Sequence, residues 1–474
     1  MIGTSGFYKI DIGADEFTGT ASQVQRNLAT QPADFTLIGP GNPVENMNST
    51  GPSDWIGFSV AAADVNGDGR SDLIAGAYNH SDDFDNQITD SGRVYALYGN
   101  GTRRLGTVDL YDTAPSLQVR SYINQLHISS SLTTADLNGD GTRDLIIGAL
   151  GAPTLKGSVF VFQGGAGLAG IKTLSPTNQA TWQFRSGEAT TTFAQPNALA
   201  AGNLNNDAID DLVVAEGNAT GPGNRTNAGA VFVFFGSASL PALWDLATMP
   251  ASLTIYGPAN GSFLSRVAVG DVNGDGKLDL IARSSTKAYV FYGPLSSGTI
   301  DLASTPANAT ITGLTGDFLA AGDVDGDGKA DIIIGLTNET DVVRGGTLVA
   351  TQTIGAAAAA RFTGVTPRTL YAFDWNGDGK AEMVVGDPFN NRAFVVFGGT
   401  LSGTADVSDR ARWIIVGEIA GDQFGFSAGS GDLDADGTAD LIIGSRMHNV
   451  TNHPLHFDDA GAVYVFYGTP PAPT

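Results

Sequence analysis

The sequence lacks cysteine altogether, and among its 474 residues the 25 Lys and Arg are outnumbered by 49 Asp and Glu. Without cysteine, disulfide bonds, thiolate metal sites and a cysteine nucleophile are excluded. The formal net charge of −24 makes nucleic acid an unfavourable partner, because its phosphate backbone would be repelled and no basic cluster offsets this. No run of 18 apolar residues occurs either, so we expect no membrane insertion.

The composition is nevertheless that of a folded protein. Hydrophobic residues make up 42% of the chain, which is enough to bury a large core. The amino-terminal MIGTSGFYKI has neither the basic flank nor the apolar run of a signal peptide. The 63 glycines mark the boundaries of a repeated pattern, which is the main source of information in this sequence.

A nine-residue pattern, D-h-[ND]-x-D-G-x-x-[DE], recurs seven times along the chain. We call the copies loops 1 to 7, and they read DVNGDGRSD (64–72), DLNGDGTRD (136–144), NLNNDAIDD (203–211), DVNGDGKLD (271–279), DVDGDGKAD (323–331), DWNGDGKAE (374–382) and DLDADGTAD (432–440). Each copy leads into a short apolar run and then, after a variable segment, into an alternation such as GRVYALYG (92–99). Runs of this length and composition between glycines predict strands. Seven such units predict an all-β fold, a seven-bladed β-propeller of four-stranded antiparallel blades.

The two ends of the chain predict how the ring closes. In several units a further strand-like segment follows the aromatic alternation, as in GTVDLYD (106–112), ALWDLATM (242–249) and GTIDLAST (298–305), but the last unit ends without one. We therefore expect residues 1–50 to supply the closing strand of blade 7, from FYKIDIGAD (7–15) or from DFTLIGPG (34–41). The whole chain, 1–474, is then one propeller domain, with 469–474 as a proline-rich, disordered tail.

Each loop has the donor composition of a calcium site. Positions 1, 3 and 5 carry carboxylate or amide oxygens, position 6 is mostly a glycine that can adopt positive φ, position 7 can offer its carbonyl, and position 9 adds a carboxylate. These hard oxygen donors favour Ca²⁺ over zinc or copper. The candidate metal ligands are Asp64, Asn66, Asp68, Arg70, Asp72, Asp136, Asn138, Asp140, Thr142, Asp144, Asn205, Asp207, Asp211, Asp271, Asn273, Asp275, Lys277, Asp279, Asp323, Asp325, Asp327, Lys329, Asp331, Asp374, Asn376, Asp378, Lys380, Glu382, Asp432, Asp434, Asp436, Thr438 and Asp440.

An ordinary acidic hairpin is the alternative interpretation of any one loop. Seven copies with clustered carboxylates argue against it, because these carboxylates would repel one another without a cation. Loop 3 is the weakest copy, since Asn203 replaces the first Asp and Ala208 stands where glycine is expected. We therefore expect about six calcium sites, with loop 3 as either a seventh site or a vacant turn.

Two segments, IGFSVAAADVNGDGRSDLIAGA (56–77) and FGFSAGSGDLDADGTADLIIGS (424–445), resemble the FG-GAP repeat of the integrin α-subunit head, which is a seven-bladed propeller. The resemblance covers essentially the whole chain. It implies calcium in the hairpin loops of the lower face and a partner on the opposite, upper face. The sequence departs from animal integrins in having more calcium-type loops, no disulfides and no stalk domains or anchor, so it looks like a free-standing bacterial relative.

The upper-face connections provide candidates for ligand binding. The longest are 41–55, 78–91, 216–228 and 446–460, and those of blades 1 and 7 hold four of the five histidines. Solvated loop tips are the alternative interpretation of these polar residues. The candidates for a ligand or second-metal patch are His80, Asp82, Asp83, Asp85, His448, His453, His456 and Asp458.

Two motifs resemble catalytic sequences but lack their context. The G-x-S-x-G at 425–429 and the G-x-G-x-x-G at 165–170 are not followed by the helix that a nucleophile elbow or a dinucleotide site requires. We therefore expect no enzyme but a calcium-binding, extracellular or cell-surface adhesion module of the integrin α-head type. It would act as a monomer with a protein or glycan partner on the upper face. The alternative is a polysaccharide lyase or hydrolase, or a lectin, on the same scaffold.

Overall fold

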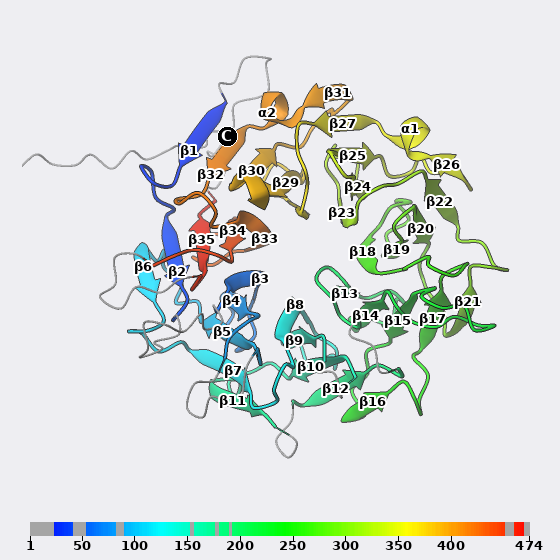
Figure 1. Ribbon diagram of the computed structural model, residues 1–474, viewed down its shortest axis with the longest axis horizontal. Coiled ribbons are helices and arrows are strands. Elements are labelled where there is room, and N and C mark those ends of the chain that lie inside the picture. Colours follow the sequence, from blue (N-terminus) through cyan, green and yellow to red (C-terminus); the bar gives the residue numbers. More distant parts are fainter. Residues whose placement is uncertain are drawn as a thin grey trace, which may run out of the picture.

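The computed structural model describes residues 23–40, 54–81, 90–151, 156–175, 180–188, 192–450 and 459–468. Within these residues the strands form seven sheets of five strands each, arranged as a ring of blades (Figure 1). The predicted seven-bladed β-propeller is confirmed. The described helical elements are short: α1 (Ile354–Ala357), α2 (Val407–Arg410) and the 3₁₀ turn η1 (Pro388–Asn390). None of the described helices has the length and apolar character needed to cross a membrane.

The blades are numbered by their loops, and their strands are given from the centre of the ring outward. Blade 1 contains β3 (Ile56–Ala63), β4 (Asp72–Ala77), β5 (Arg93–Leu97), β7 (Leu117–Ser121) and β11 (Gly170–Leu174). Blade 2 contains β8 (Ile128–Ala135), β9 (Asp144–Ala149), β10 (Ser158–Phe162), β12 (Trp182–Arg185) and β16 (Leu243–Asp245). Blade 3 contains β13 (Leu199–Gly202), β14 (Asp211–Glu216), β15 (Ala230–Phe234), β17 (Leu253–Tyr256) and β21 (Gly298–Asp301).

The remaining four blades follow the same order. Blade 4 contains β18 (Arg266–Gly270), β19 (Asp279–Arg283), β20 (Lys287–Phe291), β22 (Ala309–Thr312) and β26 (Gln352–Thr353). Blade 5 contains β23 (Phe318–Gly322), β24 (Asp331–Gly335), β25 (Glu339–Val343), β27 (Ala360–Thr363) and β31 (Gly403–Asp406). Blade 6 contains β28 (Thr369–Phe373), β29 (Glu382–Asp387), β30 (Arg392–Val396), β32 (Trp413–Val416) and β1 (Val24–Asn27). Blade 7 contains β33 (Phe424–Gly431), β34 (Asp440–Ser445), β35 (Ala462–Phe466), β2 (Phe35–Ile38) and β6 (Gly106–Asp109).

The outermost strand of each blade corrects the prediction of four-stranded antiparallel blades. It runs parallel to the fourth strand, as β6 does beside β2 and β11 beside β7. The segments at 106–112, 242–249 and 298–305, expected as fourth strands of their own units, instead contribute outer strands to the preceding blade. Alternating hydrophobicity could not reveal this, because it marks a strand without naming its neighbour. The added strand covers an otherwise open sheet edge.

The amino-terminal segment closes the ring, as expected, and it does so with two strands. Strand β2 pairs antiparallel with β35, placing Phe35 opposite Val465, so the segment 34–41 is the one that completes blade 7. Strand β1 pairs in parallel with β32 of blade 6, placing Val24 opposite Trp413. The alternative segment, 7–15, lies outside the described residues. The first described residues therefore secure two blades at once, and Figure 1 shows β1 and β2 beside the last strands of the chain.

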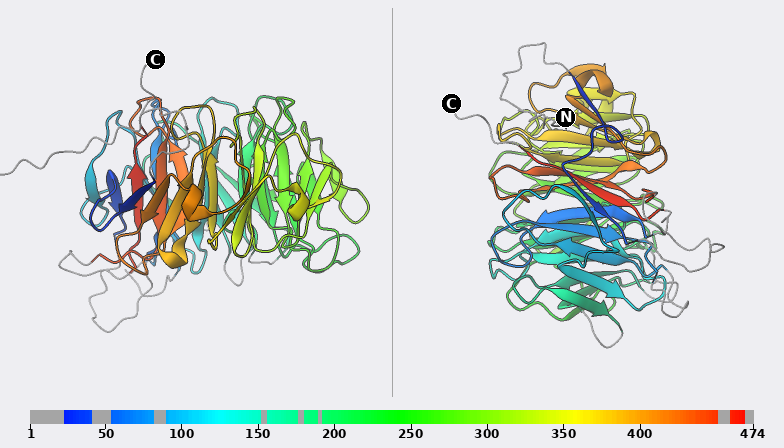
Figure 2. Two further views of the ribbon diagram at one scale, coloured as in Figure 1. Left: turned by 90° about the horizontal axis from the view of Figure 1, so that it is seen from above. Right: turned by 90° about the vertical axis from the view of Figure 1, so that its left-hand side faces the viewer.

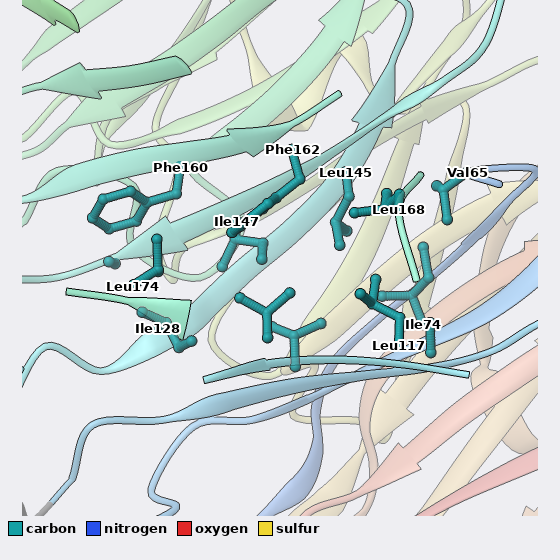
Figure 3. Close-up of a cluster of buried hydrophobic side chains, with 14 of the residues drawn as sticks. Val65, Ile74, Leu117, Ile128, Leu145, Ile147, Phe160, Phe162, Leu168 and Leu174 are labelled. Atoms are coloured by element: carbon teal, nitrogen blue, oxygen red, sulfur yellow. The ribbon is translucent and has the colours of Figure 1, made fainter. Parts of the chain in front are cut away.

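The core lies between the blades, where their faces pack together. All residues of β9 and β10 are buried, which matches their nearly continuous apolar sequences. Figure 3 shows one such cluster, between blades 1 and 2, in which Ile74 and Leu117 of blade 1 lie opposite Leu145 of blade 2. Burying each side chain of this kind contributes about 1.5–3 kcal/mol, so the interfaces hold the ring together without disulfides.

Hydroxyl groups on the innermost strands join neighbouring blades. The Ser59 hydroxyl donates to the Ser129 carbonyl at 2.8 Å, and the Ser427 hydroxyl donates to the Gly57 carbonyl at 2.7 Å. Ser427 is the serine of the G-x-S-x-G motif, and it lies within β33, which leads directly into loop 7. Its hydroxyl thus bonds blade 7 to blade 1, and no helix follows it to form a nucleophile elbow.

Candidate metal centres

The seven loops share one place in the fold. Each connects the first strand of a blade to the second, as loop 1 connects β3 to β4. Because the blades repeat around the ring in one orientation, all seven loops emerge on the same face, which we call the lower face. The side views in Figure 2 show connecting loops on both faces of the disc, and the second-to-third-strand connections lie on the opposite, upper face.

In the six loops that begin with aspartate, the position-1 carboxylate accepts hydrogen bonds from amides further along its own loop. In loop 1, Asp64 Oδ1 accepts hydrogen bonds from the Gly67 and Asp68 amides at 2.7 and 3.1 Å, and Oδ2 accepts one from the Gly69 amide at 2.7 Å. The same three bonds recur in loops 4, 5 and 6, and the last two recur in loops 2 and 7. This pattern gathers the oxygens of positions 1, 3 and 5 on one side of the loop.

Positions 3 and 5 differ between two classes of loop. In the five loops with Asn at position 3, its amide nitrogen donates to the position-5 carboxylate, as Asn138 does to Asp140 at 2.9 Å. Loops 5 and 7 have Asp at position 3, namely Asp325 and Asp434, and a carboxylate cannot donate in this way. We call these the Asn-type and Asp-type loops.

The carboxylate at position 9 is fully buried in all seven loops. In loop 1, Asp72 Oδ2 accepts from the Val65 amide at 3.0 Å and Oδ1 from the Gly99 amide at 2.9 Å, so it ties the loop to the end of the third strand. Equivalent pairs of bonds occur in the other six loops. This carboxylate therefore has a structural role in addition to its predicted role as a ligand.

Burial also changes the acidity of position 9. Removal from water raises the pKa of Asp72 to about 6, that of Asp440 to about 7 and that of Glu382 to about 8. The neighbouring carboxylates of each loop raise it further, while the backbone hydrogen bonds lower it. A buried carboxylate with this shift is one whose ionised form lacks a compensating positive charge. A divalent cation in the loop would supply that charge.

The donor geometry fits calcium. One carboxylate oxygen from each of Asp323, Asp325 and Asp327 lies within 4.8 Å of the others, and the same holds for Asp432, Asp434 and Asp440. Calcium takes six to eight oxygen ligands with flexible geometry, and these loops present only oxygen donors. The amides of the predicted position-7 residues donate to the position-5 carboxylate in six loops, as Arg70 does to Asp68. Their carbonyls remain predicted ligands.

Loop 3 has the same fold with a different composition. Its Asn203 Oδ1 accepts from the Asp207 amide at 3.1 Å, as the aspartate does in the other loops. Position 6 has positive φ throughout, and Ala208 adopts φ of 75° where Gly69 has 83°. A side chain in this left-handed conformation costs about 1 kcal/mol, so loop 3 keeps its shape against local strain.

The structure places the two described candidates of the upper-face patch inside the protein. His80 is 6% exposed and its Nδ1 lies 2.6 Å from Asp54 Oδ1, while His448 is 5% exposed with Nδ1 2.7 Å from Asp422 Oδ2. Each imidazole is buried and bonds an aspartate of its own blade, His80 in blade 1 and His448 in blade 7. The other six candidates lie outside the described residues: Asp82, Asp83, Asp85, His453, His456 and Asp458.

An aromatic cluster with one arginine lies on the upper face instead, at the junction of blades 7 and 1. The Arg446 guanidinium carbon is 4.1 Å from the centre of the Phe426 ring and 4.6 Å from that of Trp55, and Phe58 stacks on Tyr78 at 4.3 Å. We call these five residues the seam cluster. Phe58 and Phe426 also line a cavity of about 840 Å³ formed by the first strands of the blades. The only sequence signal for it was the aromatic residue that precedes Ser in both FG-GAP-like segments.

Comparison with known proteins agrees with this architecture. The FG-GAP repeat family matches residues 56–97, 129–162, 196–234 and 424–466, and an FG-GAP-like repeat family matches 271–334. The chain is a seven-bladed β-propeller that contains FG-GAP repeats. The matched segments contain loops 1, 2, 3, 4, 5 and 7 in full. The match at 271–334 begins with loop 4 itself, so it leaves out β18, the strand before that loop.

The relatives of this FG-GAP propeller are larger proteins. It is 29% identical over 234 residues to phosphatidylinositol-glycan-specific phospholipase D of Homo sapiens, covering 47% of this chain and 25% of that protein. It is 34% identical over 125 residues to integrin alpha-IIb of Mus musculus, covering 26% of this chain and 12% of that protein. It is also 34% identical over 137 residues to integrin alpha-PS2 of Drosophila melanogaster, covering 27% and 9%. The matches thus span a quarter or less of these relatives.

Proposed function

We propose that this FG-GAP propeller is a calcium-binding module whose lower-face loops hold metal ions and whose upper face binds a partner outside the cell. The observation that carries the calcium assignment is the repeated position-9 carboxylate. It is buried, tied to the third strand and left without a positive charge among its hydrogen-bond partners in all seven loops. Positions 1, 3 and 5 place further oxygens around the same point.

Calcium bound in these loops would neutralise clustered carboxylates and cross-link each hairpin. The residues proposed to hold it are those at positions 1, 3, 5 and 9, with the position-7 carbonyl. Binding to the native state alone stabilises it by RT ln(1 + [Ca²⁺]/Kd) for each site. Sites of the extracellular type, with Kd on the order of 10⁻⁴–10⁻³ M, would be largely filled at millimolar calcium. The proposed role of the ions is therefore to stabilise the ring.

The proposed partner surface is the upper face, and the partner is a protein or a glycan. The seam cluster supports this, because aromatic and arginine side chains are enriched where proteins bind partners. Integrin α chains and phosphatidylinositol-glycan-specific phospholipase D, the relatives found, support an extracellular or cell-surface setting. We propose that the protein acts as a monomer, as the ring is complete within one chain.

An adhesion or recognition role is proposed in preference to catalysis. Three carboxylates on the upper side are each engaged by a basic side chain: Asp54 by His80, Asp422 by His448, and Asp387 by Arg392 at 3.0 Å. All three carboxylates are also at most 1% exposed, so none of them faces solvent where a polysaccharide chain would bind. The relationship to an enzyme, the phospholipase, is partial and covers a quarter of its length.

The test is a binding array of glycans and matrix proteins, probed with calcium and with EDTA. An R446A/F426A variant should lose binding while its melting temperature shifts with calcium as in the wild type. A K172A variant, which removes a partly buried lysine from the outer strand of blade 1, is the control and should bind normally. Binding that persists in R446A/F426A would place the partner surface elsewhere, and the absence of bound calcium by elemental analysis would contradict the metal assignment.

A further inference from the structure

Both Asp-type loops have an arginine on the additional carboxylate. In loop 5, Arg344 Nε lies 3.1 Å from Asp325 Oδ2. In loop 7, Arg103 Nε donates to Asp434 Oδ2 and its Nη2 to Asp436 Oδ2 at 2.9 Å. In the Asn-type loops, arginines contact other positions: Arg70 Nη1 lies 3.9 Å from Asp68 Oδ2 at position 5 of loop 1, and Arg143 Nη1 lies 3.4 Å from Asp210 Oδ2 at position 8 of loop 3.

These basic groups replace what the asparagine amide supplies. In an Asn-type loop the amide donates to the position-5 carboxylate, whereas an aspartate at position 3 removes that donor and adds a negative charge beside it. In loop 7, Arg103 donates to the carboxylates at both positions. In loop 5 the two are divided, with Arg344 on Asp325 and Lys329 Nζ on Asp327 at 2.9 Å. In each loop one arginine offsets the single negative charge that the aspartate at position 3 adds.

The two arginines reach their loops by different routes. Arg344 directly follows β25, the third strand of the same blade, and also donates to the Leu401 carbonyl at 2.9 Å. Arg103 lies between β5 of blade 1 and β6, the outer strand of blade 7, and it also donates to the Gly468 carbonyl and lies over the Tyr467 ring. The two arginines do not occupy equivalent positions of the repeat, yet both pair with the aspartate at position 3. This indicates that an Asp-type loop needs a positive charge beside that aspartate.

We infer that Arg103 and Arg344 are internal counter-cations that set the calcium affinity of loops 7 and 5. They cancel the additional carboxylate and keep these two loops in the affinity range of the Asn-type loops. The inference rests on the proposed calcium binding. A guanidinium about 6 Å from a calcium ion in a water-like dielectric weakens binding about tenfold, because the two positive charges repel. Removing either arginine should therefore make its loop the tightest site of the protein.

Calcium titration calorimetry of the full chain tests this. R344Q is expected to move one ion into a class bound about tenfold more tightly, and R103Q should do the same for a different loop. D325N alone should weaken one site, because Arg344 then faces one carboxylate fewer. The double variant D325N/R344Q gives loop 5 the composition of an Asn-type loop, and all its affinities should lie within about twofold of wild type.

Charge-matched and stability controls separate the outcomes. R120Q removes an arginine from the outer part of blade 1, where Arg120 lies over Tyr122, and should leave every affinity unchanged. In EDTA, R344Q should melt below wild type and D325N/R344Q close to it. The inference is overturned if R344Q and R103Q leave all sites unchanged, if R120Q tightens binding equally, or if D325N tightens its site. A wild-type titration without any calcium binding would instead overturn the proposed function.

Discussion

The lower face repeats one nine-residue loop seven times, whereas the upper face differs from blade to blade. On the lower face, position 9 makes the same two backbone contacts in every blade. On the upper face, the connection between β19 and β20 spans residues 284–286, while that between β14 and β15 spans 217–229. The uniform contacts of the lower face fit a role in stability, and the variable connections of the upper face fit a role in recognition.

We expect the largest effect from a deletion that opens the ring, because both faces depend on ring closure. Deleting residues 1–40 takes away β1 and β2, which are the outer strand of blade 6 and the fourth strand of blade 7. The exposed edges should cause aggregation or strand exchange between molecules. Size-exclusion chromatography with light scattering measures this. Deleting 469–474 is the control and should have almost no effect. A monomeric, fully stable 1–40 deletion would show that the ring closes without these strands.

The next effect belongs to the lower face alone. Six sites, each at ten times its Kd, would together contribute about 8 kcal/mol of stability, so chelation should lower the melting temperature by about 10 °C or more. Differential scanning calorimetry with millimolar calcium and with EDTA measures the shift, and elemental analysis counts the ions. Identical melting curves under the two conditions would contradict the contrast between the faces.

The sequence predicted the seven turns of the lower face because their determinants are local, while the metal ligands within these turns stay predictions. Oxygen-bearing side chains at fixed spacing, with glycine at position 6, specify a turn and a donor set within nine residues. The pairing partner of each outer strand was not predictable, since β6 reads as an ordinary strand after β5 and yet pairs with β2 of another blade. Long separations also concealed Arg103, which lies 331 residues from Asp434.

The upper face was predicted less well because the sequence does not show which of its polar residues are buried. His80 and His448 read as polar loop residues, but each packs inside its blade against an aspartate 26 positions earlier in the chain. Neither position carries a pattern that separates a buried, hydrogen-bonded histidine from an exposed ligand. The seam cluster likewise joins Trp55 and Arg446, which the ring closure brings together.

A smaller effect distinguishes loop 3 from its six counterparts. Replacing Ala208 by glycine should stabilise the protein by about 1 kcal/mol, because Ala208 has φ of 75° and glycine adopts this conformation without a steric cost. Urea denaturation in EDTA measures the change. The control is A201G, in the interior of β13, which should destabilise the protein by about 0.5–1 kcal/mol. Glycine loses more conformational entropy on folding, and at this position no backbone strain is removed in return. A destabilised A208G would mean that the side chain itself supports loop 3.

The smallest effect lies on the upper face and depends on pH. His127 stacks on Tyr78 at 4.7 Å, and burial lowers its pKa below the ordinary value of 6.5. Below pH 6.5 the unfolded chain therefore binds a proton at His127 more readily than the native state does. The free energy of unfolding of the wild type consequently decreases as the pH falls through 6.5. The H127Q variant has no titrating group at this position. The packing energy that it loses is the same at every pH, so this loss cancels when the stability difference is compared at two pH values. With calcium held constant, the stability difference between wild type and H127Q should narrow by up to about 1 kcal/mol from pH 7.5 to pH 5.5. A difference that stays constant over this range would show that His127 titrates alike in both states, and that burial at the seam does not extend to it.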